Sequence, residues 1–342
     1  MQNLLDPAIL FFVFGVLAGA VRSNLEIPPA IAKFLSLYLL MALGLKGGFA
    51  LAQSGLTPEI ALSLGAAVAM AFIVPALGYA FLKHRVSRFD AAAVAAAYGS
   101  VSAVTFVTAL QYLESTGLRF GGHMAVAMVL MESPAIIMAV LLANTLRVAQ
   151  AAPAGVVVTG QGTAALGGGG MGAAGNGPGL SVGKILHESF TDGAHLLLLG
   201  AMVVGFISGE SGKAMMQPFS GDLFKGMLAF FLLDMGLMVA RNFKEARKAS
   251  PVLIGYAALG PLVHAALALG LAWALSLPAA DAALLMVLSA SASYIVVPAV
   301  LRYAIPEANP ALYFGLSLGI TFPLNILVGI PVYTQVAMQA LG

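Results

Sequence analysis

The hexapeptides YGSVSA (residues 98–103) and SASASY (residues 289–294) interrupt otherwise apolar stretches with small hydroxyl residues. At membrane depth, such residues let a helix break and turn its free backbone groups toward a polar solute, as happens where secondary transporters bind their cargo. The simpler alternative is that these residues only allow close helix packing or bond back to the preceding turn. Because the two interruptions lie about half a chain apart, we predict that together they form a binding site.

The composition excludes an ordinary soluble domain. Hydrophobic residues make up 60% of the 342 positions and charged residues only 9%, whereas soluble domains carry about 25% charged residues. We therefore predict an all-α polytopic protein of the plasma (inner) membrane. Ten apolar stretches are near the length of a span, the first and the sixth being short. They cover residues 7–20, 27–45, 60–82, 91–113, 124–146, 195–207, 223–240, 252–277, 282–301 and 311–340.

The distribution of charge predicts the orientation. If the N-terminus lies outside, the connections on the inside carry eleven Lys or Arg residues, while those on the outside carry only Lys46, Arg119 and Lys213. This asymmetry follows the positive-inside rule with both termini outside, which requires an even number of spans.

The chain also repeats itself. Residues 149–185, which include four consecutive glycines, predict a Gly/Ala-rich cytoplasmic linker between a first repeat (1–148) and a second (186–342). Gly44 and Gly236 lie 192 residues apart, Ser100 and Ser291 lie 191 apart, and the prolines at 134 and 323 lie 189 apart. Five spans per copy is an odd number, so we predict inverted repeats with broken fourth and ninth spans.

This arrangement brings the two breaks face to face near the middle of the membrane. A helix N-terminus carries unpaired N–H groups and about half a positive charge, enough to hold a small anion without Lys or Arg. The hydroxyl groups that could bind the anion's oxygens belong to Ser100, Ser102, Thr105, Ser289, Ser291 and Ser293.

Two carboxylates lie well inside spans, Glu132 in the fifth and Asp234 in the seventh. Each is unfavourable there unless it is paired or functional. Together with Ser and Thr hydroxyls and free carbonyls, a carboxylate would form an oxygen cage suited to Na⁺. Alternatively, each acid caps a helix or stays protonated. Asn325 in the tenth span adds a polar group or bonds across a helix interface.

No convincing motif for an enzyme is present. The glycine run at 167–172 follows no strand, the phosphate-loop pattern ending at Lys184 is broken, and His187 lacks the second histidine of a zinc site. The sequence thus predicts a protein that is not an enzyme, with no organic cofactor and no nucleic-acid partner.

Four ordered motifs resemble the SbtA-type sodium-dependent bicarbonate transporter family: YLLMALGLKGG (38–48), YGSVS (98–102), MESPA (131–135) and VLLAN (140–144). The resemblance implies ten spans in two inverted repeats, usually assembled as a homotrimer in membrane lipid and regulated from the cytosol by a PII-like protein. It implies that bicarbonate is held between half-helix ends by residues at Ser100, Val101, Ser102, Ser291, Ala292 and Ser293. It also implies that Na⁺ binds beside the anion, near Thr105, Glu132, Thr321 and Asn325.

The leading hypothesis is a secondary active symporter that imports bicarbonate with Na⁺ by alternating access. A transporter of another small anion fits the same chemistry. A Na⁺/H⁺ exchanger that uses Glu132 and Asp234 is a second hypothesis, an intramembrane hydrolase with Ser102 or Ser291 as nucleophile is a third, and a membrane sensor without transport is a fourth.

Overall fold

The computed structural model describes residues 6–55, 57–151, 193–294 and 296–342, and these ranges contain helices and no strands. The helices before the predicted linker are α1 (Pro7–Ala20), α2 (Pro29–Ser54), α3 (Pro58–Leu82), α4 (Arg88–Gly99), α5 (Ala103–Ser115) and α6 (Met124–Ala151). Those after it are α8 (Gly193–Met216), η2 (Gln217–Asp222), α9 (Leu223–Ala246), α10 (Pro251–Ala274), α11 (Ala279–Ala290), α12 (Val296–Ala304), α13 (Pro310–Leu316), η3 (Ser317–Thr321), α14 (Phe322–Leu324), η4 (Asn325–Gly329) and α15 (Ile330–Leu341). The predicted linker from residue 152 onward lies outside the described residues.

Seven helical stretches in the described part are long and apolar enough to cross a membrane. One of them, Leu196–Phe243, runs over 48 residues and contains residues 196–207 of the sixth predicted span and all of the seventh. The first predicted span corresponds to the shorter apolar helix Pro7–Ala20, and the ninth begins with another, Ala279–Ala290. The chain is therefore a multi-pass membrane protein, while the arrangement of ten spans stays a prediction.

Two spans differ from their predicted course. The sixth span is predicted to end at residue 207, and the backbone leaves the helical conformation at Gly209, where φ is 55° and ψ is −143°, before a second helical stretch reaches Met216. Glycine adopts a positive φ without strain, so the chain bends there between the two helical stretches. The tenth span contains two π-helical turns, η3 and η4, and a proline follows closely after each, Pro323 and Pro331. Proline has no N–H to donate, which favours a wider turn.

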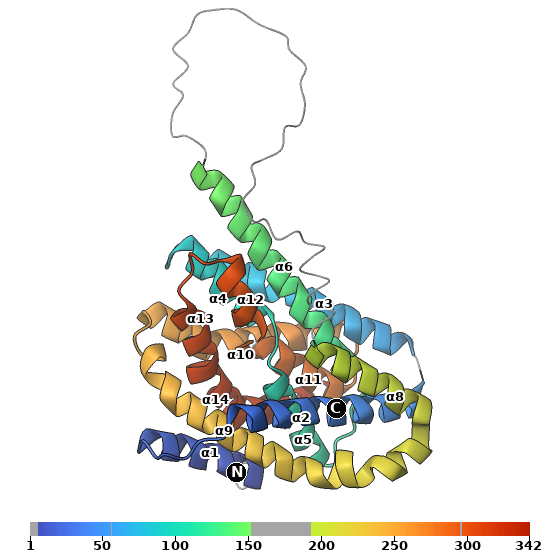
Figure 1. Ribbon diagram of the computed structural model, residues 1–342. Helices are drawn as coiled ribbons and strands as arrows, with labels where there is room; N and C mark the ends of the chain where they lie inside the picture. The colour runs from blue at the N-terminus through green and yellow to red at the C-terminus, as the bar shows by residue number, and fades with distance from the viewer. Residues whose placement is uncertain (1–5, 56, 152–192, 295) are drawn as a thin grey trace, which may run out of the picture.

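Helices from the two halves of the chain pack in pairs, α1 along α9 and α2 along α8 (Figure 1). Small residues form both contacts. Gly15 faces Gly236, and a Cβ at Gly15 would lie only 2.3 Å from the carbonyl oxygen of Leu233. Gly44 faces Ala201, and a Cβ at Gly44 would lie 2.8 Å from the Cβ of Ala201. Small residues let helix backbones approach closely in a membrane, where van der Waals packing drives association.

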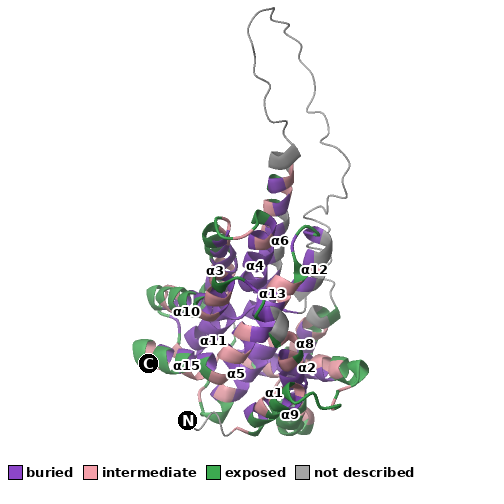
Figure 2. Ribbon diagram, turned by 90° about the vertical axis from the view of Figure 1, so that its left-hand side faces the viewer, coloured by how far each residue is buried: buried purple, intermediate pink, exposed green. Residues whose placement is uncertain are grey.

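The centre of the molecule is formed by α4, α5 and α11, which are almost entirely buried (Figure 2). Of the 18 most apolar consecutive residues in Arg88–Ser115, 94% are buried. In the corresponding stretch of Pro251–Ala274, which forms α10, only 39% are buried. The run of alanines in α4 leaves little side-chain volume, which allows neighbouring helices to surround it. Consequently, the backbone of this segment can leave the helical conformation without exposing polar groups to lipid.

An aspartate in the first turn of α4 and another in the first turn of α11 anchor loops from the opposite half of the chain. Oδ1 of Asp281 accepts the N–H of Gly121 at 2.6 Å, and Gly121 lies in the loop after α5. Oδ1 of Asp90 accepts the N–H of Asn309 at 2.8 Å, and Asn309 lies in the loop after α12. The two broken segments are thus tied to each other at both ends.

Candidate functional site

The first break separates α4 from α5 at residues 100–102, where the sequence predicted it. Gly99 ends α4 against Pro75 of α3, and a Cβ on Gly99 would lie 2.5 Å from the proline ring. Ser102 then starts α5, because its Oγ accepts the N–H of Thr105 at 3.2 Å. A serine in this position satisfies one of the N–H groups that have no partner inside the helix.

The second break separates α11 from α12 at residues 291–295, of which Ile295 lies outside the described residues. Ser291 closes α11, because its Oγ donates to the carbonyl of Leu288 at 2.8 Å. Ser293 caps α12, because its Oγ accepts the N–H of Val297 at 3.3 Å. Each break therefore has a serine that caps the second half-helix.

The two breaks are in direct contact. The N–H of Ser102 donates to Oγ of Ser291 at 2.9 Å, and the N–H of Ser293 donates to the carbonyl of Ala97 at 2.8 Å. These bonds join segments that lie nearly 200 residues apart in the sequence. The structure thus brings the two predicted halves of the anion site together.

All six residues predicted to hold the anion are buried: Ser100, Val101, Ser102, Ser291, Ala292 and Ser293. The hydroxyl oxygens of Ser100 and of Ser289 have no hydrogen-bond partner among the described residues. A buried hydroxyl without a partner is unfavourable, so these two groups are available to a polar ligand.

The electrostatic character of the site comes from the backbone. The starts of α5 and α12 both lie at the breaks, and residues 98–103 and 289–294 contain no Lys or Arg. Helix N-termini attract negative charge through aligned peptide dipoles. The arrangement can hold a small anion without a basic side chain.

Thr321, predicted to lie near the cation, sits beside the first break. Its Oγ1 donates to the carbonyl of Ala257 at 2.8 Å and accepts the hydroxyl of Tyr98 at 2.6 Å. Tyr98 comes directly before Gly99, the last residue of α4. Thr321 therefore links the π-helical turn η3 to the end of the half-helix α4.

Asn325 occupies the equivalent place at the second break. Its Nδ2 donates to the carbonyl of Ala290, the last residue of α11, at 2.8 Å, and its Oδ1 accepts the hydroxyl of Tyr333 at 3.1 Å. Both polar groups of the amide are thus engaged, although Oδ1 keeps a second lone pair. This residue positions the break, and its oxygen can also face a cation.

The remaining cation candidates come from three other helices. Thr105 in α5 donates its hydroxyl to Oγ of Ser102 at 2.9 Å, which places it at the first break. Glu132 lies buried in α6, which packs against α4, and Asp234 lies buried in α9. Within the described ranges, no three His, Asp or Glu side chains gather where they could hold a metal. A cation site here would therefore consist mainly of neutral oxygens.

Sequence reasoning missed the tyrosines and the aspartates that support the site. Tyr98 bonds to Thr321 and Tyr333 bonds to Asn325, and no local sequence pattern predicts these contacts. The aspartates in the first turns of α4 and α11 did carry a signal, because positions 90 and 281 are 191 residues apart, like Ser100 and Ser291.

Comparison with known proteins agrees with the motifs. Residues 7–338 match the family model described as the Na⁺-dependent bicarbonate transporter superfamily, so the match covers nearly the whole chain and includes both breaks. No curated protein matches the sequence.

Proposed function

The chain belongs to the Na⁺-dependent bicarbonate transporter superfamily, and from this membership we propose that it is a symporter that imports bicarbonate with Na⁺ by alternating access. The observation that carries the proposal is the contact between the breaks, in which the N–H of Ser102 bonds to Oγ of Ser291 at 2.9 Å. The start of α5 meets the end of α11 there, and both serines are buried.

Bicarbonate suits this point because it is small, carries one negative charge and presents several oxygens. The N-terminal N–H groups of α5 and α12 supply partial positive charge. The hydroxyl of Ser100, which bonds to no other group in the described part of the chain, supplies a donor. Bicarbonate also carries one hydroxyl group, which a serine oxygen or a backbone carbonyl can accept.

Na⁺ would bind beside the anion and offset its charge. Thr105 and Asn325 place oxygens at the first and second breaks, and Thr321 adds a third near Tyr98. Glu132 is our candidate for the charged ligand, with Asp234 as a second. Sodium is the coupling ion of the family, and we propose neither an organic cofactor nor an enzymatic activity.

We propose that the ten spans form two inverted repeats, and the packing supports this. The contact of Gly15 with Gly236 has its counterpart in the contact of Gly205 with Gly48. A twofold axis that exchanges the repeats would produce such swapped pairs. The loops anchored by Asp90 and Asp281 are paired in the same way, because each aspartate binds a loop of the other half of the chain.

For alternating access, we propose that the buried half-helices move against a scaffold formed by α1, α2, α8 and α9. The orientation with both termini outside, the cytoplasmic linker, the location in the plasma membrane, the homotrimer and the PII-like regulator stay predictions from the sequence. If bicarbonate symport is refuted, the alternatives are a transporter of another small anion and a Na⁺/H⁺ exchanger.

The test is uptake of labelled bicarbonate by the purified protein in sealed vesicles, with and without a Na⁺ gradient. We expect Na⁺-dependent uptake by the wild type and a loss of at least tenfold in Ser100→Ala, because that hydroxyl lies at the first break and bonds to none of the described residues. Ser63→Ala is the matched control, since Ser63 in α3 is also buried, also bonds to none of the described residues and lies outside both breaks. Uptake that does not depend on the Na⁺ gradient, or proton movement in the absence of bicarbonate, would refute the proposal.

A further inference from the structure

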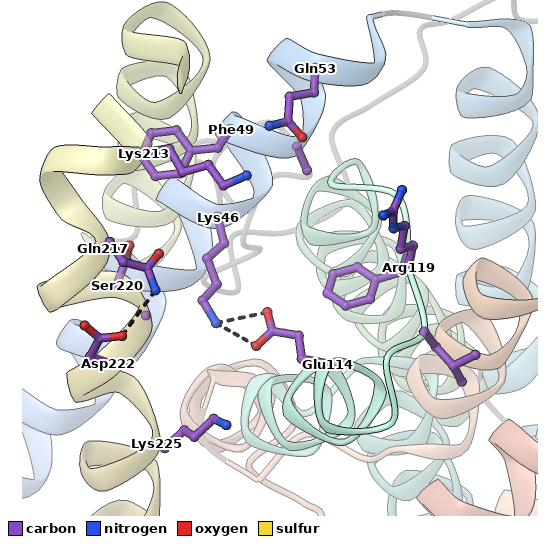
Figure 3. A pocket seen from close by; sticks show the side chains of 14 residues that line it. Lys46, Phe49, Gln53, Glu114, Arg119, Lys213, Gln217, Ser220, Asp222 and Lys225 are labelled. Atoms are coloured by element: carbon purple, nitrogen blue, oxygen red, sulfur yellow. Dashed lines mark hydrogen bonds and ion pairs between the residues drawn. The ribbon is translucent and has the colours of Figure 1, made fainter. Parts of the chain in front are cut away.

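A large cavity opens to the surface between α2, the end of α8 with η2 and α9, and the end of α5 (Figure 3). Its volume is about 1130 Å³. Four basic and two acidic side chains line it: Lys46, Arg119, Lys213, Lys225, Glu114 and Asp222. We call this cavity the basic vestibule.

The acidic groups of the basic vestibule are already engaged. Nζ of Lys46 donates to both carboxylate oxygens of Glu114 at 2.9 and 3.0 Å, and Figure 3 shows the two side chains facing each other from α2 and α5. Oδ1 of Asp222 accepts Nε2 of Gln217 at 3.2 Å.

The other basic groups of the vestibule have a weak acidic partner or none in the described part of the chain. Lys213 comes only within 3.9 Å of a carboxylate oxygen, that of Glu210. For Arg119 and Lys225, both exposed, no ion pair forms within the described part of the chain. A concave wall with an excess of one sign of charge raises the local concentration of the opposite ion.

Apolar side chains lie between the basic vestibule and the first break. A second cavity of about 20 Å³ shares Lys46 and Glu114 with the vestibule. Its other walls include the buried side chains of Leu43, Phe106, Leu110 and Phe224. The N–H of Phe106 donates to the carbonyl of Ser102, so this ring stands one helical turn from the cap of α5.

Lys46 lies at the boundary between the two cavities. Its ammonium group is 4.1 Å from the centroid of the Phe224 ring as well as in contact with Glu114. From Ser102 to Glu114, α5 rises about 18 Å at 1.5 Å per residue. The helix therefore runs directly from the break to the vestibule.

We propose that the basic vestibule is the outer entrance for the transported anion. Arg119, Lys213 and Lys225 gather a small oxyanion there, and the pair Lys46–Glu114 closes the path to the breaks until the anion replaces Glu114 as the partner of Lys46. Losing that pair separates α2 from α5, one helix of the scaffold from one half-helix of the core. This inference rests on the proposed symport of bicarbonate.

The test compares Arg119→Gln/Lys225→Gln with wild type in intact cells, by initial rates of labelled bicarbonate uptake at fixed external Na⁺. We expect the KM for bicarbonate to rise about threefold or more in the variant with little change in the maximal rate, because the vestibule acts on local concentration. The wild-type KM should rise with ionic strength between roughly 0.01 and 0.1 M, over which the Debye length falls from about 30 to about 10 Å, and the variant should lose most of this dependence.

Lys33→Gln is the matched control, because Lys33 is exposed near the other end of α2, and it should behave as wild type. A variant with the KM and the salt dependence of wild type would overturn the inference while leaving bicarbonate transport intact. A wild type without any Na⁺-dependent uptake would overturn the proposed function, and the inference with it.

Discussion

Ser291→Ala should weaken the fold at the point where the two breaks meet. The Oγ of Ser291 makes two buried hydrogen bonds, accepting from the N–H of Ser102 at 2.9 Å and donating to the carbonyl of Leu288 at 2.8 Å. Without it, the Leu288 carbonyl still accepts the N–H of residue 291 itself, which lies 3.2 Å away. The cost therefore falls on the N–H of Ser102, which is left buried without its acceptor, and such a group costs about 1–3 kcal/mol.

Equilibrium unfolding of the purified protein in mild detergent measures this cost. We expect Ser291→Ala to lose about 1–3 kcal/mol of unfolding free energy. Ser100→Ala should lose almost none, because no described residue bonds to the Ser100 hydroxyl. Both variants should lose transport. Equal stability of Ser291→Ala and wild type, or an equal loss in Ser100→Ala, would refute the assignment of a structural role to one hydroxyl and a ligand role to the other.

Two further predictions concern the helix pairs and the surface. Gly44→Ala should destabilise the protein by about 1–3 kcal/mol in detergent unfolding, since its Cβ would lie 2.3 Å from the carbonyl oxygen of Leu198, whereas Gly200→Ala, with open space around it, should not. Glu307 accepts hydrogen bonds from Arg147 at 2.7 and 2.8 Å, and these hold the pKa of the Glu307 carboxyl below its ordinary value of 4.5. A lowered pKa means that the pair stabilises the protein above pH 4.5 and stops doing so as the pH falls through the folded-state pKa. The stability difference between wild type and Glu307→Gln, at most about 1 kcal/mol for an exposed pair, should therefore vanish in acid; a difference that grows there would contradict this.

The two breaks could be predicted from the sequence because their causes are local. A glycine followed by serines ends one helix and caps the next, and the same pattern of hydroxyl residues recurs 191 positions later. The contact of Ser102 with Ser291 followed from the repeat rather than from any local signal. The spacing of similar motifs along the sequence thus supplied the long-range information that short motifs lack.

Other features could not be predicted because they depend on distant partners or on backbone freedom. The bond between Tyr98 and Thr321 joins residues 223 positions apart, and nothing near either residue specifies it. The second helical stretch of α8 begins after a positive φ at Gly209, and hydropathy carries no information about that backbone conformation. The vestibule is lined by three stretches of the chain, residues 46–53, 114–120 and 213–225, and no local pattern in the sequence connects their charged residues.

The swapped pairing of α1 with α9 and of α2 with α8 has a consequence for biosynthesis. The ribosome delivers the N-terminal half to the bilayer long before α8 and α9 exist, so the glycine-lined faces around Gly15 and Gly44 first meet lipid instead of their partners. Neither half can complete its own packing. Two fragments divided between α6 and α8 should therefore be degraded when made separately and should accumulate when they are produced in the same cell.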